Sequence, residues 1–377
     1  MARNRILAGF SAMLVAAPAA LAAPVCTTGE LFAGHPDYED PMHRAKNGQG
    51  LKDVPPLGFR TLVFAGDRMV TAVGQEIWYS DLSAEKPVVT RMSGREGRRD
   101  AVPGACADAR FVNVSGLAML PDGSMAGADQ GANNIFQITD PFGPDCNVAF
   151  IAGAVEPQTP LANGQPTNIG DADGVGGDVL LGGPDWVAAL DDGTIFFIDS
   201  GNGKLKKVLP GGTRAVETVV KLPDAVYYAM IARDGKLYAI GNNSSSDGLL
   251  VEVDPATAEV REIVKGRSDR WLSDGSINVS GLATDGEGFF TTQSGQLLYV
   301  TLDGDIASIA GNGTYFSLSG DYDPTVPHPA GDLQLWAQRR NQTAGASVFL
   351  AYRDGQVFFS AAGNTAYVLK IACPPQP

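Results

Sequence analysis

Asn113 to Ala118 reads Asn-Val-Ser-Gly-Leu-Ala, and the same six residues recur from Asn278 to Ala283, 165 positions later. Each copy is followed, after three more residues, by an acidic-Gly turn, Asp122-Gly123 or Glu287-Gly288. The two copies therefore belong to an internal repeat. Their separation is too long for one supersecondary unit, so the true period should be a fraction of it, and three units of about 55 residues would fit.

Further segments share one design, in which an apolar run, a turn, a second apolar run, a loop and a third apolar run follow each other. The clearest spans residues 184–208, and relatives span 225–253, 347–371 and 59–80. With the two hexapeptide copies they make six units. Short β-rich runs separated by Asp-Gly turns predict β-hairpins, and successive hairpins at this spacing suit the blades of a β-propeller. We therefore expect an all-β fold, a single six-bladed β-propeller of four-stranded antiparallel blades over residues 59–373.

The first residues have the features of a Sec-type signal peptide. A short basic region with Arg3 and Arg5 precedes an apolar, Ala-rich stretch, and Ala20-Leu21-Ala22 forms an A-x-A cleavage site. The apolar stretch is too short for a good membrane span. We expect cleavage after Ala22, a periplasmic or secreted mature protein without a membrane span, and a segment 23–58 that leads into the ring.

The chain is acidic, with a formal net charge of −14. Loss of the leader removes two arginines and no acidic residue, which makes the charge −16. Such a surface repels phosphate backbones and anionic lipid, and the sequence contains no basic run, so we exclude nucleic acid as a partner. Solubility alone is a sufficient reason for the acidity.

All four cysteines, Cys26, Cys106, Cys146 and Cys373, lie in the exported part of the chain, where disulfides are expected. Three pairings are possible. Cys106 and Cys146 flank one blade, while Cys26 and Cys373 lie near the two chain ends, which a closed ring must bring together. We therefore predict the pairs Cys26–Cys373 and Cys106–Cys146, of which the first would stabilise the fold by about 4 kcal/mol or somewhat more in the loop-entropy model.

Residues 170–208 resemble an NHL repeat. They combine a Gly-rich stretch from Gly170 to Gly177, Pro184 before the first strand, and an Asp-x-x-Asn loop, Asp199 to Asn202, before a basic-apolar last strand. A second copy spans 94–135, and a weaker third copy spans 310–333. The resemblance implies the propeller fold, but it does not imply an activity, because one fold hosts many functions.

Residues just before the innermost strand of each blade should surround the mouth of the central funnel. Counting back from each turn places amides, hydroxyls, one carboxylate and aromatic side chains there, a mixture that suits a ligand pocket. For any one of these residues, satisfying a strand end or filling the core is the competing interpretation. The candidate ligand-binding residues are Asn113, Ser115, Asp185, Trp186, Tyr227, Tyr228, Asn278 and Ser280.

Three of these candidates, Asp185, Asn113 and Asn278, carry oxygen ligands of the kind that Ca²⁺ accepts. The arrangement is similar to the metal site of gluconolactonase-type propellers, so Ca²⁺ is the candidate cofactor, although Asp185 is the only carboxylate in the set. The Asp/Gly tract 170–177 is also similar to a Ca²⁺ loop, but it lacks the Glu that closes an EF-hand, and a turn-rich loop is the favoured interpretation. None of the aligned mouth positions is His, which disfavours a zinc lyase.

From these features we expect an exported, NHL-like propeller that binds a small molecule, a sugar or an extracytoplasmic protein through its funnel face. The alternative is an enzyme, either a divalent-metal-dependent, lactonase-like hydrolase or a lyase, with its active site in the same funnel and Asp185 as metal ligand or base. The sequence contains no Gly-x-Ser-x-Gly elbow, Walker A motif or dinucleotide fingerprint, and it assigns no catalytic residue.

Overall fold

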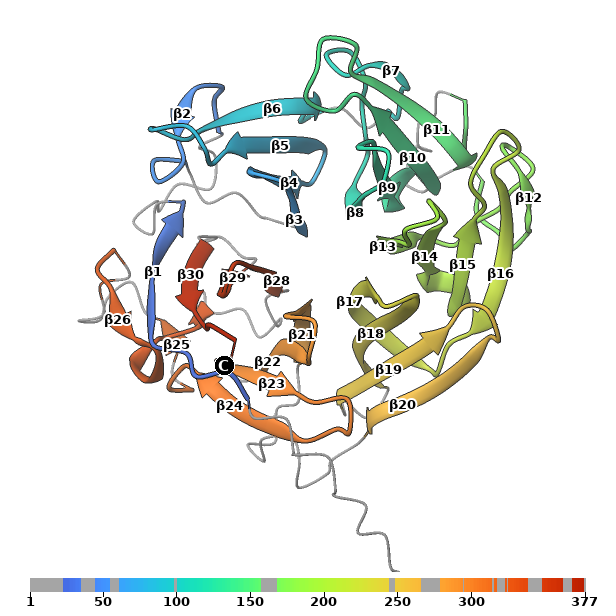
Figure 1. Ribbon diagram of the computed structural model, residues 1–377. Helices are drawn as coiled ribbons and strands as arrows, with labels where there is room; N and C mark the ends of the chain where they lie inside the picture. Colours follow the sequence, from blue (N-terminus) through green and yellow to red (C-terminus); the bar gives the residue numbers. More distant parts are fainter. Residues whose placement is uncertain are drawn as a thin grey trace, which may run out of the picture.

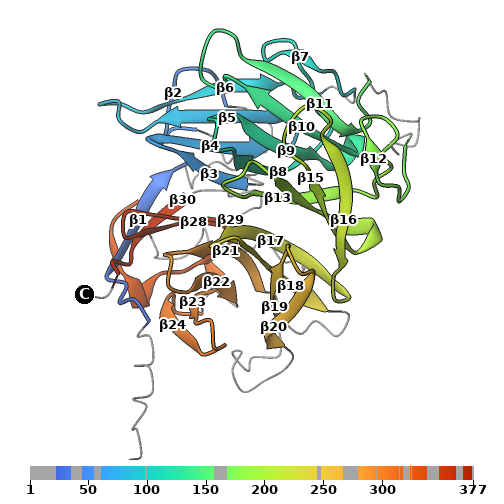
Figure 2. The same cartoon turned by 45° about the vertical axis from the view of Figure 1, so that its right-hand side comes forward.

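Six antiparallel sheets of four or five strands stand around a central axis and form a six-bladed β-propeller (Figures 1 and 2). This computed structural model describes residues 23–34, 45–54, 61–97, 100–156, 168–243, 248–265, 279–293, 295–313, 315–316, 323, 325–337, 348–361 and 368–375. The expected fold is confirmed. Within the described ranges the helical elements are three short 3₁₀ turns, Gln130–Ala132, Ser200–Asn202 and Ala330–Asp332. None of the described helices is long and apolar enough to cross a membrane.

The blades follow each other along the chain, and each runs from an innermost strand outward. Blade 1 holds β3 (Thr61–Ala65), β4 (Arg68–Val73), β5 (Glu76–Asp81), β6 (Val88–Gly94) and, on its outer edge, β2 (Gln49–Gly50). Blade 2 holds β8 (Val114–Met119), β9 (Met125–Asp129), β10 (Asn134–Thr139), β11 (Asn147–Gly153) and the outer β7 (Gly104–Ala105). Blade 3 holds β13 (Pro184–Ala189), β14 (Ile195–Asp199), β15 (Lys204–Val208), β16 (Ala215–Lys221) and the outer β12 (Gly174–Val175).

The remaining blades complete the circle. Blade 4 holds β17 (Ala225–Arg233), β18 (Lys236–Asn243), β19 (Gly248–Asp254) and β20 (Glu259–Lys265). Blade 5 holds β21 (Val279–Thr284), β22 (Phe289–Gln293), β23 (Gln296–Val300) and β24 (Ile306–Ala310). Blade 6 holds β28 (Val348–Arg353), β29 (Gln356–Ala361), β30 (Val368–Ala372), β1 (Thr28–Ala33) and β26 (His328–Pro329). A short parallel pair, β25 (Tyr315–Phe316) and β27 (Trp336–Ala337), lies outside these sheets.

Acidic-Gly turns join the first two strands of blades 2 to 6, as their sequence suggests, and Gly66-Asp67 joins them in blade 1. Gly123 and Gly193 have φ of 82° and 83°, a conformation that residues with a Cβ rarely adopt, so glycine is needed there. The side chains of Asp122 and Asp192 accept the backbone N–H two residues later, at 2.9 and 2.8 Å, and close the turn. These turns all lie at the end of the propeller opposite the start of the inner strands.

The two ends of the chain close the ring. β1 pairs antiparallel with β30, with Gly29 opposite Ile371 and Leu31 opposite Leu369, and the two strands lie side by side in Figure 2. The sheets therefore include residues from Thr28 onward, earlier than the boundary at 59 that the repeats suggested. Each innermost strand contacts the next around the circle, including β28 with β3, so the ring is continuous.

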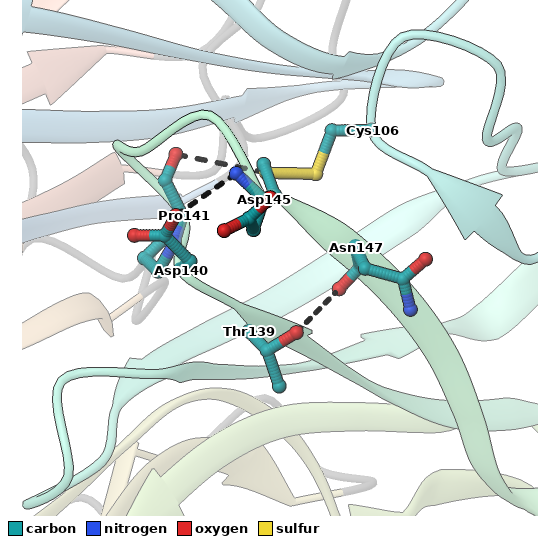
Figure 3. The surroundings of a disulfide bond; sticks show 7 residues. Cys106, Thr139, Asp140, Pro141, Asp145 and Asn147 are labelled. Carbon is teal, nitrogen blue, oxygen red and sulfur yellow. Dashed lines mark hydrogen bonds between the residues drawn. A yellow bond between two sulfur atoms is a disulfide. The ribbon is translucent and has the colours of Figure 1, made fainter.

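Both predicted disulfides are present. Cys26–Cys373 lies beside the β1–β30 pair and staples the first strand to the last. Cys106–Cys146 ties the loop that follows β7 to the start of β11 (Figure 3). In the β10–β11 hairpin next to it, the Asp140 carboxylate accepts the backbone N–H of Asp145 at 3.1 Å (Figure 3).

The Asp/Gly tract 170–177 includes the short outer strand β12 of blade 3, and a lysine of the same blade binds its carboxylates. Nζ of Lys206 lies 3.0 Å from carboxylate oxygens of both Asp171 and Asp173, and 3.7 Å from Asp199. The side chains of Lys206 and Asp199 are both 0% exposed. An ammonium group from the same blade therefore neutralises the carboxylates that could otherwise have faced a cation.

Candidate functional site

The inner strands of blades 2 to 5 are irregular near their beginnings. The pairing register shifts between Val114 and Gly116 in β8, between Asp185 and Val187 in β13, and between Tyr227 and Ala229 in β17. β21 has a wider shift, between Ser280 and Ala283. A bulge adds a residue to one strand and redirects its side chain. The extra residues in the first three strands are three of the candidates, Ser115, Trp186 and Tyr228.

Trp186 reaches across the axis of the propeller. Its φ of 46° is left-handed, which is rare for a bulky residue and is maintained only where the surrounding structure enforces it. Its indole N–H donates to the carbonyl oxygen of Tyr227 in blade 4 at 2.7 Å, and its ring lies 5.8 Å from that of Phe349 in blade 6. A Cβ on Gly116 would lie 2.6 Å from the nitrogen of Val187, so only glycine lets β8 approach this bulge.

A cavity of about 240 Å³ lies along the axis and is lined by all six inner strands. The residues that line it run from Trp186 to Ala189 in β13 and from Ala229 to Ala232 in β17, toward the hairpin turns. Trp186 therefore stands at one end of the cavity. Most of the lining side chains are aliphatic, so the cavity between Trp186 and the hairpin turns is apolar. On the other side of Trp186 the chain carries the polar residue Asp185.

A chain of hydrogen bonds joins blades 2 and 3 on the polar side of Trp186. The amide of Asn113 donates to Oε1 of Gln130 at 3.1 Å, and Nε2 of Gln130 donates to Oδ2 of Asp185 at 3.3 Å. The other oxygen of Asp185 accepts the backbone N–H of Trp186 at 3.0 Å. Two amides and one carboxylate, all half-buried, are thus held next to the indole. We use the name funnel face for the end of the propeller at which the inner strands begin and on which Asn113, Gln130 and Asp185 lie.

Sequence reasoning missed Gln130, because the residue lies in the loop after the second strand and not before the first. Its one signal is its place directly after Asp129, in the stretch Asp-Gln-Gly-Ala-Asn from Asp129 to Asn133. Asp129 is fully buried and accepts the backbone N–H groups of Val112 and Asn113, each at 2.7 Å. Burial raises the pKa of Asp129 to about 6, although these N–H groups favour the charged form. The carboxyl group thereby fixes the backbone that carries Asn113.

Other candidates lie deeper in the structure and already have partners. Ser115 donates to the carbonyl oxygen of Pro184 at 3.1 Å, a contact between blades 2 and 3. Ser280 lies 3.4 Å from the hydroxyl of Thr292, and the hydroxyl of Tyr227 donates to a backbone oxygen at 3.1 Å. All three side chains are buried. Tyr228 is half-buried, and Asn278 lies outside the described residues.

Two of the three candidate metal ligands, Asp185 and Asn113, lie among the described residues. Both oxygens of Asp185 accept N–H groups, and the amide nitrogen of Asn113 faces Gln130. Within the described ranges no group of three or more His, Cys, Asp or Glu side chains comes together in a way that could hold a metal ion. A cation bound to Asp185 at this position would have to displace the amide of Gln130. Among the described members of the set, Asp185 is the one carboxylate that could bind it.

Comparison with known proteins supports the fold. No protein-family profile and no curated protein matches the chain. The structure is similar to that of an auxiliary nutrient binding protein from Bacteroides ovatus ATCC 8483, with a TM-score of 0.59 and 12% identity over 93% of this chain and 77% of that one. At this identity the likeness indicates a shared fold.

Two further solved structures are similar at lower scores. One is a nidogen/laminin complex, with a TM-score of 0.49 and 11% identity over 81% of this chain and 98% of that one. The other is selenomethionine-substituted virginiamycin B lyase from Staphylococcus aureus, with a TM-score of 0.48 and 10% identity over 84% of this chain and 96% of that one.

Proposed function

We propose that the protein is an exported binding protein that takes its ligand on the funnel face. The observation that carries the proposal is Trp186, a bulky residue held in a left-handed conformation at one end of the axial cavity, beside a hydrogen-bonded carboxylate and two amides. Strained residues of this kind concentrate at ligand sites. An indole beside amides and a carboxylate suits a ligand with both an apolar face and hydroxyl or amide groups, such as a sugar or a peptide.

The bulges explain why this side chain is available. In a regular strand the side chain at position 186 would project from one face of the sheet, toward an adjacent blade, whereas a bulge such as the one in β13 redirects a side chain. The hydrogen bond to blade 4 and the ring contact with blade 6 then hold it there. A preformed aromatic surface loses little conformational freedom when a ligand binds, which favours affinity.

Export is part of the proposal. The chain has two disulfides and no free cysteine among its four, and such bonds persist in oxidising compartments. The leader-like sequence at residues 1–22 lies outside the described residues, so its removal remains a prediction. Mass spectrometry of the mature protein should find Ala23 as the first residue.

The test is a thermal-shift screen of the purified protein against mono- and oligosaccharides and short peptides, followed by calorimetry on the hits. Trp186→Leu and Asp185→Asn should each weaken a hit by about tenfold or more, which corresponds to about 1.4 kcal/mol. Trp78→Phe is the matched control, because Trp78 is a buried tryptophan on β5, the third strand of blade 1, and is not among the residues that line the axial cavity. Unchanged affinity in a double variant of Trp186 and Asp185 would show that the ligand binds elsewhere.

A divalent-metal-dependent hydrolase or a lyase is the second candidate, favoured by the half-buried carboxylate of Asp185 on the funnel face. Metal analysis and melting curves with Ca²⁺ and with EDTA separate the two, since an ion at about a hundred times its dissociation constant stabilises the folded state by about 2.7 kcal/mol. A metal-free protein whose melting temperature responds to neither reagent would rule out the metal-dependent enzyme. A Ca²⁺ shift that Asp185→Asn abolishes would favour it.

A further inference from the structure

A cleft of about 630 Å³ lies between blades 2 and 3, at the opposite end of the propeller from the funnel face. Its rim contains the turns at Asp122 and at Asp191 to Gly193, which follow the inner strands, whereas Asn113 and Asp185 precede them. The floor is apolar and includes Ile151, the largely buried side chain that β11 contributes. The cleft is therefore separate from the proposed ligand site.

Gln137 on β10 gives this cleft an orienting polar group. The side chain lines the cleft, and the residue is only 7% exposed. Nε2 of Gln137 lies 2.7 Å from the hydroxyl of Ser124, which lies 2.5 Å from Oδ1 of Asp122. Because the carboxylate can only accept, Ser124 donates to Asp122 and must accept from Gln137. The Oε1 atom of Gln137 is therefore the acceptor that remains available, because it accepts no hydrogen bond from the described residues.

The charges on the rim are unequal. Arg214 lines the same cleft as the three aspartates Asp122, Asp191 and Asp192, and it makes no ion pair within the described ranges. The pKa of Asp122 is lowered, mainly by its hydrogen bonds from Ser124 and to a lesser extent by the positive charge of Arg214, which lines the same cleft. This leaves the exposed pair Asp191 and Asp192 as the excess negative charge, on the blade 3 side.

We propose that this cleft binds an extended, basic peptide segment of a partner protein. An apolar side chain of the segment lies on the floor formed by Ile151, Ile195 and Val208, and its backbone N–H donates to the free oxygen of Gln137. An adjacent Lys or Arg faces Asp191. Charge complementarity with the rim selects a basic segment over an acidic one, and the formal charge of −14 on the whole chain attracts it from a distance.

The experiment uses three fluorescein-labelled peptides of about eight residues, capped at both ends, with a central Leu flanked by Lys, Gln or Glu. Fluorescence anisotropy with the mature protein should show the Lys peptide binding about tenfold more tightly than the Gln peptide, the Glu peptide binding most weakly, and the differences shrinking as salt is added. Equal affinity for all three peptides, or no binding, would overturn the proposal.

Two variants locate the site. Asp191→Asn should weaken the Lys peptide about three- to fivefold and leave the Gln peptide unchanged, because an exposed ion pair contributes little more than this. Gln137→Leu should weaken both peptides by about fivefold, since both lose the same hydrogen bond. Glu85→Gln, which removes an exposed carboxylate from blade 1, is the charge-matched control and should change neither.

The remaining outcomes are decisive too. If Asp191→Asn has no more effect than Glu85→Gln, or if Trp186→Leu abolishes peptide binding, the cleft is the wrong site. If 1,4-diaminobutane displaces the Lys peptide as well as the unlabelled peptide does, the cleft takes small amines and the assignment to a peptide fails. Should Gln137→Leu not fold, as circular dichroism would reveal, the surface variant Asp191→Asn and the competition assay still decide.

Discussion

Removal of the disulfide that joins the chain ends should cost more stability than removal of the other one. In the unfolded chain each bond restricts a loop, and the entropy lost on closing it grows with loop length. Cys26 and Cys373 are 347 positions apart, for which the loop-entropy relation gives about 5 to 6 kcal/mol. Cys106 and Cys146 are 40 apart, for which it gives about 4 kcal/mol.

The assay is guanidinium unfolding of two double variants, Cys26→Ala/Cys373→Ala and Cys106→Ala/Cys146→Ala, under non-reducing conditions. Alanine is chosen because Cys106 and Cys373 are buried, where a serine hydroxyl would need a partner. Without the Cys26–Cys373 disulfide, β1 is attached to β30 by backbone hydrogen bonds alone. A larger loss in the Cys106–Cys146 variant would refute the argument from loop length.

Other predictions concern buried charge. Lys206→Met should lower the free energy of unfolding by about 3 to 5 kcal/mol, because it leaves the fully buried Asp199 without its cation. Lys204→Met breaks a partly exposed ion pair and should lower it by about 1 kcal/mol or less. Equal losses of the two variants in urea unfolding would contradict this. Asp129→Asn should change the pH dependence of stability. Burial raises the pKa of Asp129 to about 6 from the usual 3.8, so the stability it contributes is fully present below about pH 4 and is lost as the pH rises through about 6. Relative to the variant, the wild type should lose about 3 kcal/mol between about pH 4 and pH 7 in urea titrations, and a constant difference would disprove the role of burial.

The architecture was predictable because its signals are local. The hexapeptide copies and the acidic-Gly turns specify hairpins through backbone conformation alone, and hairpins at a regular spacing lead to blades. The placement of β1 was not predictable in the same way. Thr28–Ala33 reads as an ordinary short strand, and nothing within it indicates that its partner lies more than three hundred residues away in β30.

The positions of the candidate residues at the start of the inner strands were predictable, but the directions of their side chains were not. Counting back from the turns finds the positions where the inner strands begin, yet a bulge decides which way each side chain points, and bulges leave no clear mark in the sequence. Ser115 and Trp186 occupy equivalent bulges, but the first turns to a carbonyl oxygen of the next blade and the second turns to the axis. Gln130 reaches the same place from a different loop, which alignment on turns cannot reveal.

The pairing of β1 with β30 also has a consequence for biogenesis. β1 is synthesised long before its partners β26 and β30, so blade 6 forms only after the rest of the domain has been made. Such distant contacts make folding slow. During that interval β1 exposes unpaired backbone groups to which a chaperone could bind, and formation of the Cys26–Cys373 disulfide would mark the closure of the ring.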